Sequence, residues 1–73
     1  MKASLAPSIT AAVTASSLPE SFKRLAAERI ESSDDPKATA IALIVNFQDR
    51  ANVTDEEFLA ASALTEEIHR ITG

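Results

Sequence analysis

The sequence contains no cysteine, one glycine and one histidine among its 73 residues. Without cysteine, neither a disulfide framework nor a thiolate metal site can form. The only glycine, Gly73, cannot build a glycine-rich loop that cradles phosphates. The only histidine, His69, has no recognisable catalytic partner, and no serine lies in a nucleophile motif. We therefore expect a protein that is not an enzyme and has no cofactor.

One pair of residues has a spacing that occurs in metal sites. Glu66 and His69 are three positions apart, as in helical proteins that hold two metal ions between carboxylates. That chemistry requires two such pairs and two further glutamates. With one histidine in the chain, we expect Glu66 and His69 to be solvated and no metal to bind.

Long apolar runs are also missing, and no segment approaches the roughly 18 residues needed to span a bilayer. The N-terminus has Lys2 and an acceptable cleavage sequence at Val13-Thr14-Ala15. However, the apolar core that a signal peptide requires is interrupted by Ser4, Pro7, Ser8 and Thr10. We therefore expect a cytoplasmic protein without membrane contact.

Positive charge is scarce as well. The net charge is −4 and the isoelectric point is about 4.8. This balance argues against direct binding to nucleic acid and suits a basic protein surface instead. The length allows one domain, with a core that gives only marginal stability.

The most informative stretch is the charge-free segment 38–47, ATAIALIVNF. As a helix, it would spread its large side chains over roughly 200° of its circumference, so it must be covered from two sides. A strand is the alternative, because Thr39, Ile41 and Leu43 would then share one face. No second strand-like run is present to pair with it. We therefore predict a central helix, which we call the hub helix.

Local signals place three helices, over about 18–32, 36–50 and 55–72. Ser17 and Glu20 fit a capping box before the first helix. Asp35 and Pro36 fit the N-cap and first position of the hub helix. Thr54 and Glu57 form a second capping box, with Val53 and Phe58 as a hydrophobic staple. The predicted fold is an all-α, small three-helix domain over residues 18–73.

Residues 1–17 allow two interpretations. Leu5, Ile9 and Val13 recur every four residues and would form a narrow apolar stripe on a helix. Pro7 and the β-branched residues weaken such a helix. The segment is therefore either a flexible arm or a marginal helix that forms when its stripe meets a partner. Ile9 is a partner-binding candidate on the second interpretation.

Two further regions supply partner-binding candidates. Arg29 falls within the apolar face of the predicted helix 18–32, where it either extends to solvent or anchors a partner carboxylate; Lys23 on the same helix is also a candidate. Leu59 points away from the apolar face of the last helix. With the neighbouring Asp55 and Glu56, it could form a contact patch rimmed by negative charge.

The segment 25–32, LAAERIES, resembles the inhibitory helix of small antitoxins that block Fic-type AMP-transferases. The inhibitory glutamate of that family would be Glu31. Ala27 stands where the family has serine or threonine, and Ser32 where it has glycine or asparagine, so two of the three motif positions differ. The resemblance implies an antitoxin function.

The function favoured by size, charge and helical content is regulation through protein binding. Small acidic helical proteins of this kind resemble phage- or plasmid-encoded inhibitors of larger host proteins. RNA polymerase is the best single target, because its grooves are basic. The alternatives are the Fic antitoxin and a structural homo-oligomer that associates through the hub helix. A monomer is slightly favoured.

Overall fold

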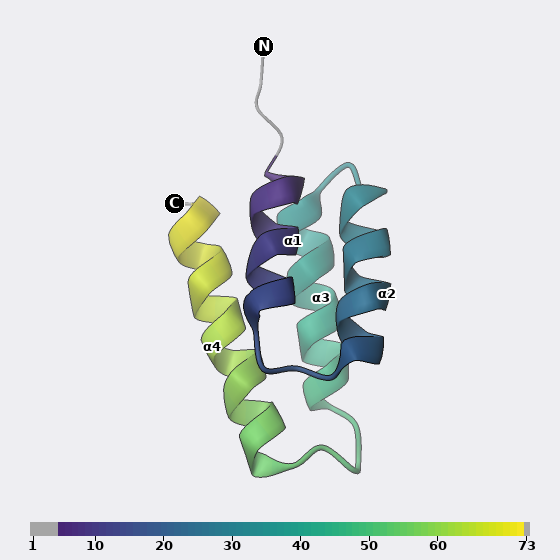
Figure 1. The fold of residues 1–73 in the computed structure, drawn as a ribbon, viewed down its shortest axis with the longest axis vertical. Coiled ribbons are helices and arrows are strands. Elements are labelled where there is room, and N and C mark those ends of the chain that lie inside the picture. Colours follow the sequence, from purple (N-terminus) through teal and green to yellow (C-terminus); the bar gives the residue numbers. More distant parts are fainter. Residues whose placement is uncertain (1–4, 73) are drawn as a thin grey trace.

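A computed structural model describes residues 5–72, which form four α-helices (Figure 1). Their bounds are α1 Ala6–Ala15, α2 Glu20–Glu31, α3 Pro36–Gln48 and α4 Asp55–Thr72. Residues 5–72 contain no strand, so the hub helix is confirmed as a helix and corresponds to α3. The predicted all-α class is confirmed.

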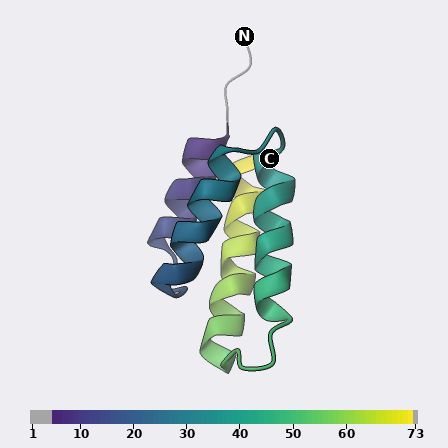
Figure 2. The ribbon, with the colours of Figure 1, turned by 90° about the vertical axis from the view of Figure 1, so that its right-hand side faces the viewer.

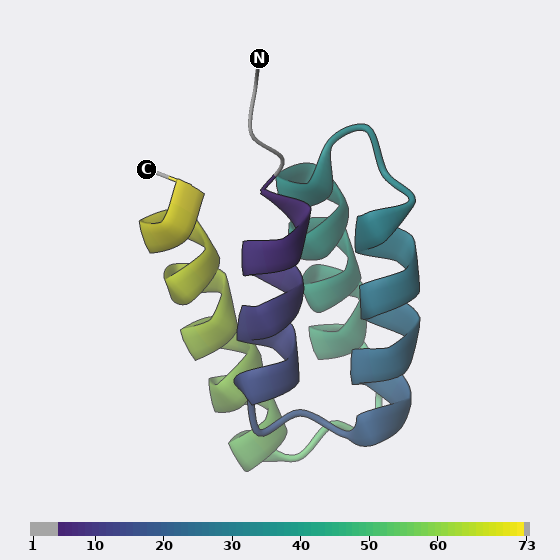
Figure 3. The ribbon, with the colours of Figure 1, turned by 45° about the horizontal axis from the view of Figure 1, so that its top comes forward.

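The four helices pack as two antiparallel pairs. In Figure 2 the α1–α2 pair forms one layer and the α3–α4 pair forms the other. Helices α1 and α3 each contact all three other helices. By contrast, no Cα atom of α2 comes within 8 Å of a Cα atom of α4 anywhere in residues 5–72. Figure 3 shows the reason, since α1 lies between α2 and α4.

Of the two interpretations of residues 1–17, the structure shows the helical one for residues 6–15. Residues 6–15 are a fourth helix, with Ala6, Ile9 and Val13 buried. The apolar stripe finds its partner within the chain, because α2, α3 and α4 together form the surface that covers it. The part of the predicted arm over residues 1–4 lies outside the described residues.

The start of α2 also differs from the prediction. The helix begins at Glu20 with Pro19 as its N-cap, and no side chain caps it, so the capping box at Ser17 does not form. Residues 16–19 instead form the connection between α1 and α2, and Leu18 in this connection belongs to the core and is only 3% exposed. Ser16 stabilises the connection, since its Oγ donates to the Val13 carbonyl at 2.6 Å and accepts from the Leu18 N–H at 3.4 Å.

The starts of α3 and α4 follow the predicted signals. The Asp35 carboxylate accepts a hydrogen bond from the Ala38 N–H at 3.2 Å, which makes Asp35 the N-cap of α3. Thr54 and Glu57 form the reciprocal capping box, with distances of 3.0 and 3.1 Å. Helix α3 ends at Gln48, slightly before the predicted position.

The core is apolar throughout, since no polar or charged residue of the described chain is buried. The Phe22 and Phe47 rings lie 5.0 Å apart, and the Arg50 guanidinium lies over the Phe47 ring at 5.4 Å. The buried stripe of α2 runs through Phe22, Ala26 and Ile30, so Leu25 lies beside it and is 39% exposed. The core residues are Ala6, Ile9, Val13, Leu18, Phe22, Ala26, Ile30, Ala40, Ile44, Phe47, Ala61, Leu64 and Ile68.

Candidate protein-binding surface

The negative charge of the protein is concentrated on one helix. Helix α4 has five acidic residues and one arginine, a net charge of −4, while the rest of the chain has six acidic and six basic residues and is neutral. The neighbouring helix α1 has no charged residue. The side of the bundle formed by α1 and α4 therefore combines a neutral helix with a strongly acidic one.

The same helix carries the most exposed large apolar side chain of the described residues. Leu59 is 66% exposed, and the adjacent Phe58 is 47% exposed. Both follow directly after the acidic first turn of α4, where Asp55 and Glu56 are exposed. We call residues 55–59 the acidic–apolar turn. Three acids in this turn also stabilise the helix through its dipole, so their presence has a structural cause as well.

The acidic–apolar turn is held in place by α3. The Gln48 side-chain amide at the end of α3 donates to the Phe58 carbonyl at 3.1 Å and to Ser62 Oγ at 3.0 Å. The two Gln48 hydrogen bonds give Leu59 and its acidic neighbours a fixed position on the bundle. Val45, three residues earlier on α3, is 55% exposed.

A groove of about 280 Å³ lies between α4 and the end of α1. Most of its lining side chains are small, because four alanines and two serines contribute to the walls. Glu67 is the charged residue in the wall. The lining residues are Ala12, Ala15, Ser16, Ser17, Ala60, Ala63, Leu64 and Glu67.

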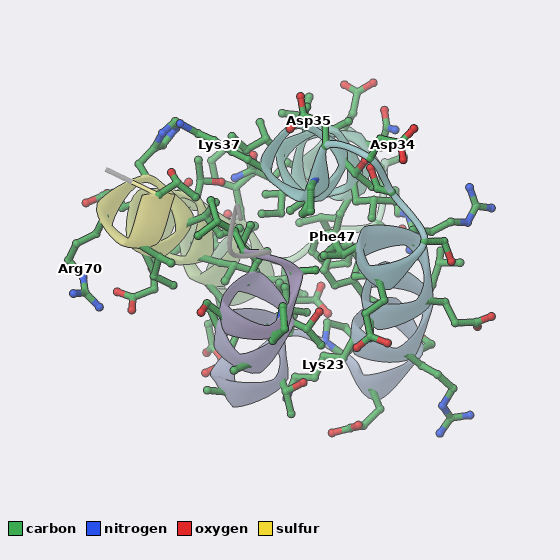
Figure 4. The ribbon with its side chains drawn as sticks, turned by 90° about the horizontal axis from the view of Figure 1, so that it is seen from above. Lys23, Asp34, Asp35, Lys37, Phe47 and Arg70 are labelled. Atoms are coloured by element: carbon green, nitrogen blue, oxygen red, sulfur yellow. The ribbon has the colours of Figure 1, made fainter. Side chains whose placement is uncertain are left out.

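The Glu67 carboxylate at this groove is paired with Arg70, one turn further along α4. The Arg70 Nε donates to Glu67 Oε1 at 3.0 Å, and Nη2 donates to the second oxygen. These hydrogen bonds are the main reason why the pKa of Glu67 lies below its ordinary value. In Figure 4 the Arg70 side chain extends away from the bundle, which leaves the pair solvated.

A pH titration tests this pair. Because the pKa of Glu67 is lowered in the folded state, the pair stabilises the fold above the unfolded-state pKa, and the effect is lost as the pH falls through the folded-state value. We expect Arg70→Gln to raise the pKa of Glu67 to its ordinary value, measured by NMR of the side-chain carboxyl. Arg24→Gln on α2 is the matched control and should leave it unchanged. An unaltered Glu67 pKa in Arg70→Gln would contradict the pairing.

The six candidates from the sequence do not form one site. Asp55, Glu56 and Leu59 lie together in the acidic–apolar turn. Arg29 is exposed on α2, which does not approach α4 within the described residues. Ile9 is 0% exposed, so in this fold it belongs to the core and offers no surface to a partner.

Lys23 lies in the space between α1 and α2, as Figure 4 shows. Its side chain is only 16% exposed, and its Nζ lies 3.7 Å from the Glu20 carboxylate. The ammonium group is therefore already engaged within α2. This arrangement favours a packing role for the Lys23 stem.

The residues that carry the antitoxin resemblance lie on α2. Glu31 is its last residue and is exposed, Ser32 is its C-cap, and Ala27 is half-buried. The hub helix, the proposed interface of the homo-oligomer alternative, buries Ala40, Ile44 and Phe47 inside the chain. Both alternatives remain predictions.

The groove is the feature that sequence reasoning missed. The only signal was the spacing of the alanine pairs Ala12/Ala15 and Ala60/Ala63, each three residues apart on one helix face. That signal has meaning only when residues 6–15 are helical and packed beside α4. If residues 1–17 are interpreted as a flexible arm, the groove has no α1 wall and cannot be predicted.

Other kinds of site receive no support from the described part of the chain. Within residues 5–72, no three histidine, aspartate or glutamate side chains are grouped so that they could hold a metal ion. None of the helices in that range has the length and apolar character to cross a bilayer. Comparisons with protein-family models, curated proteins and solved structures give no match.

Proposed function

We propose that the protein is a small non-enzymatic regulator that binds and inhibits a larger host protein, as phage- or plasmid-encoded inhibitors do. One observation supports the proposal above the others. The helix that carries the entire net charge, α4, also carries the most exposed large apolar residue of residues 5–72, Leu59. An apolar contact bordered by charges of one sign is typical of a surface that selects partners of the opposite sign.

RNA polymerase is the target we propose. Proteins that handle nucleic acid have basic grooves, and an acidic surface can occupy such a groove in place of the phosphate backbone. Leu59 and Phe58 would contribute apolar contacts, while Asp55 and Glu56 would contribute long-range attraction to the partner. Attraction between exposed charges weakens as salt is added.

The test passes purified RNA polymerase, and separately a whole-cell lysate, from the organism that carries the gene over the immobilised protein. We expect retention of the polymerase at low salt, release at high salt, and reduced transcript yield when the free protein is added. Leu59→Ser should weaken binding by at least roughly tenfold, as for a central contact residue. Leu25→Ser is the matched control, because Leu25 is an exposed leucine on α2, which does not contact α4 within the described chain.

The possible results separate the target from the function. Retention of a different host protein, lost in Leu59→Ser and kept in Leu25→Ser, would replace the polymerase and preserve the regulator. If the immobilised protein retains no host protein at low salt, the regulator function is overturned. Equal binding by both leucine variants would show that α4 is not the contact surface.

A further inference from the structure

We propose that the groove between α1 and α4 receives an apolar side chain from a basic amphipathic helix of the partner. This inference rests on the proposed function and names the kind of partner segment. The groove volume of about 280 Å³ is at the small end for ligand sites, so it suits one anchoring side chain better than a cofactor.

The shape of the groove favours a helix as its occupant. Ala12 and Ala15 on α1 face Ala60 and Ala63 on α4, and small side chains allow a third backbone to approach closely. Leu59 lies one helical turn before Ala63, so the two share a strip along α4. A helix laid along this strip would contact Leu59 at one end and fill the groove further along, as in helix-in-groove recognition.

Charge decides which helix fits. Glu56 lies one turn before Ala60, and Glu67 lies one turn after Ala63, so an acidic residue stands at each end of the alanine pair. These two glutamates are 11 residues apart, which corresponds to about 16 Å along the helix axis. A partner helix with lysine or arginine residues about three turns apart would meet both glutamates.

The α1 side adds no competing charge. Helix α1 is uncharged, so nothing in the described part of the groove repels a cation. Arg70 is the basic residue paired with Glu67, and the pair is exposed, so an incoming cation can share the Glu67 carboxylate. A second copy of this chain fits less well, because it would bring another α4 with four net negative charges to the same place.

The test measures binding of a synthetic helical peptide of 18 residues with a leucine and alanine stripe and lysines about three turns apart. We expect NMR shifts of the backbone amides of the groove alanines on α1 and α4. The dissociation constant should rise at least tenfold between low and high salt. A matched peptide with glutamate in place of each lysine should not bind.

Two variants examine the groove itself. Ala63→Phe fills it from an exposed position, and we expect at least a tenfold loss of peptide affinity. Ala42→Phe makes the same change at an exposed position of α3 outside the groove and should bind like the parent. Circular dichroism of both variants establishes that they are folded. Glu56→Gln should weaken peptide binding, while Glu28→Gln on α2 should not.

The outcomes distinguish this inference from the proposed function. Undiminished peptide binding by folded Ala63→Phe, or equal binding of the acidic peptide, would overturn the groove as the site. Concentration-dependent shifts of the groove residues without peptide would assign the groove to a second copy and also overturn it. If Ala63→Phe still binds the host protein while Leu59→Ser does not, the regulator stands and the groove inference fails.

Discussion

Replacing Ile9 by alanine is expected to lower the free energy of unfolding by about 2–5 kcal/mol. The Ile9 side chain is 0% exposed and lies on α1, which contacts the other three helices. A domain of this size has a total stability of only a few kcal/mol. We therefore expect Ile9→Ala to be largely unfolded at room temperature, measured by urea denaturation followed by circular dichroism.

Leu5→Ala provides the matched control for this experiment. Leu5 belongs to the same predicted stripe and stands at the start of α1, but it is 40% exposed. Its loss should cost at most about 1 kcal/mol, because much of the side chain is already in water. If Ile9→Ala cost no more than Leu5→Ala, α1 would be a dispensable arm rather than part of the core.

The second large effect is expected for Phe47→Ala, at about 3–5 kcal/mol. Phe47 is 4% exposed, its ring lies 5.0 Å from that of Phe22, and the Arg50 guanidinium lies over the same ring. The substitution leaves a cavity in the core beside the hub helix. It also removes the contacts of the Phe47 ring with Phe22 and Arg50. Urea denaturation measures the loss.

Phe58→Ala is the control for the loss of an aromatic ring. Phe58 is 47% exposed, so its removal should cost only about 1 kcal/mol. A double-mutant cycle between Phe22 and Phe47 should give a coupling of about 0.5–1.5 kcal/mol. Similar costs for Phe47→Ala and Phe58→Ala would show that the hub helix is not the centre of the core.

The parts of the fold that were predicted correctly are those with local causes. Asp35 caps α3 through a residue three positions away, and the Thr54–Glu57 box closes within four residues. Such signals are complete within a short stretch of chain, so the sequence alone shows them. The capping box at Ser17 is the exception, because the connection that contains it is held by the Ser16 hydrogen bonds and by burial of Leu18. The ends of helices are less well determined, because their last turns depend on what they pack against.

Helix α1 could not be predicted from local signals, because its stability comes from tertiary contacts. No side chain caps it, and it has no acidic residue in its first turn and no basic residue in its last. A helix of 10 residues is too short to be stable alone in water. Burial of Ile9 and Val13 against the rest of the chain stabilises it, and the sequence does not show where those surfaces lie.

The candidate surface was predicted in part. Leu59, Asp55 and Glu56 follow from the helical periodicity of one segment, and the structure places them together and exposed. The separation of Arg29 from this group depends on the helix order around the bundle. The sequence contains no signal that keeps α2 away from α4. Only the structure therefore shows that Arg29 lies apart from the candidates on α4.

The position of α1 also determines how the bundle responds to mechanical force. The start of α1 and the end of α4 lie side by side at the same end of the bundle (Figure 1). A pull on these two ends would separate α1 from α4 progressively from that end of the bundle. The contacts of one helical turn would then bear the whole load at a time. Forced unfolding depends on the barrier to opening rather than on total stability. We expect the molecule to yield at low force, with the contact between α1 and α4 opened first.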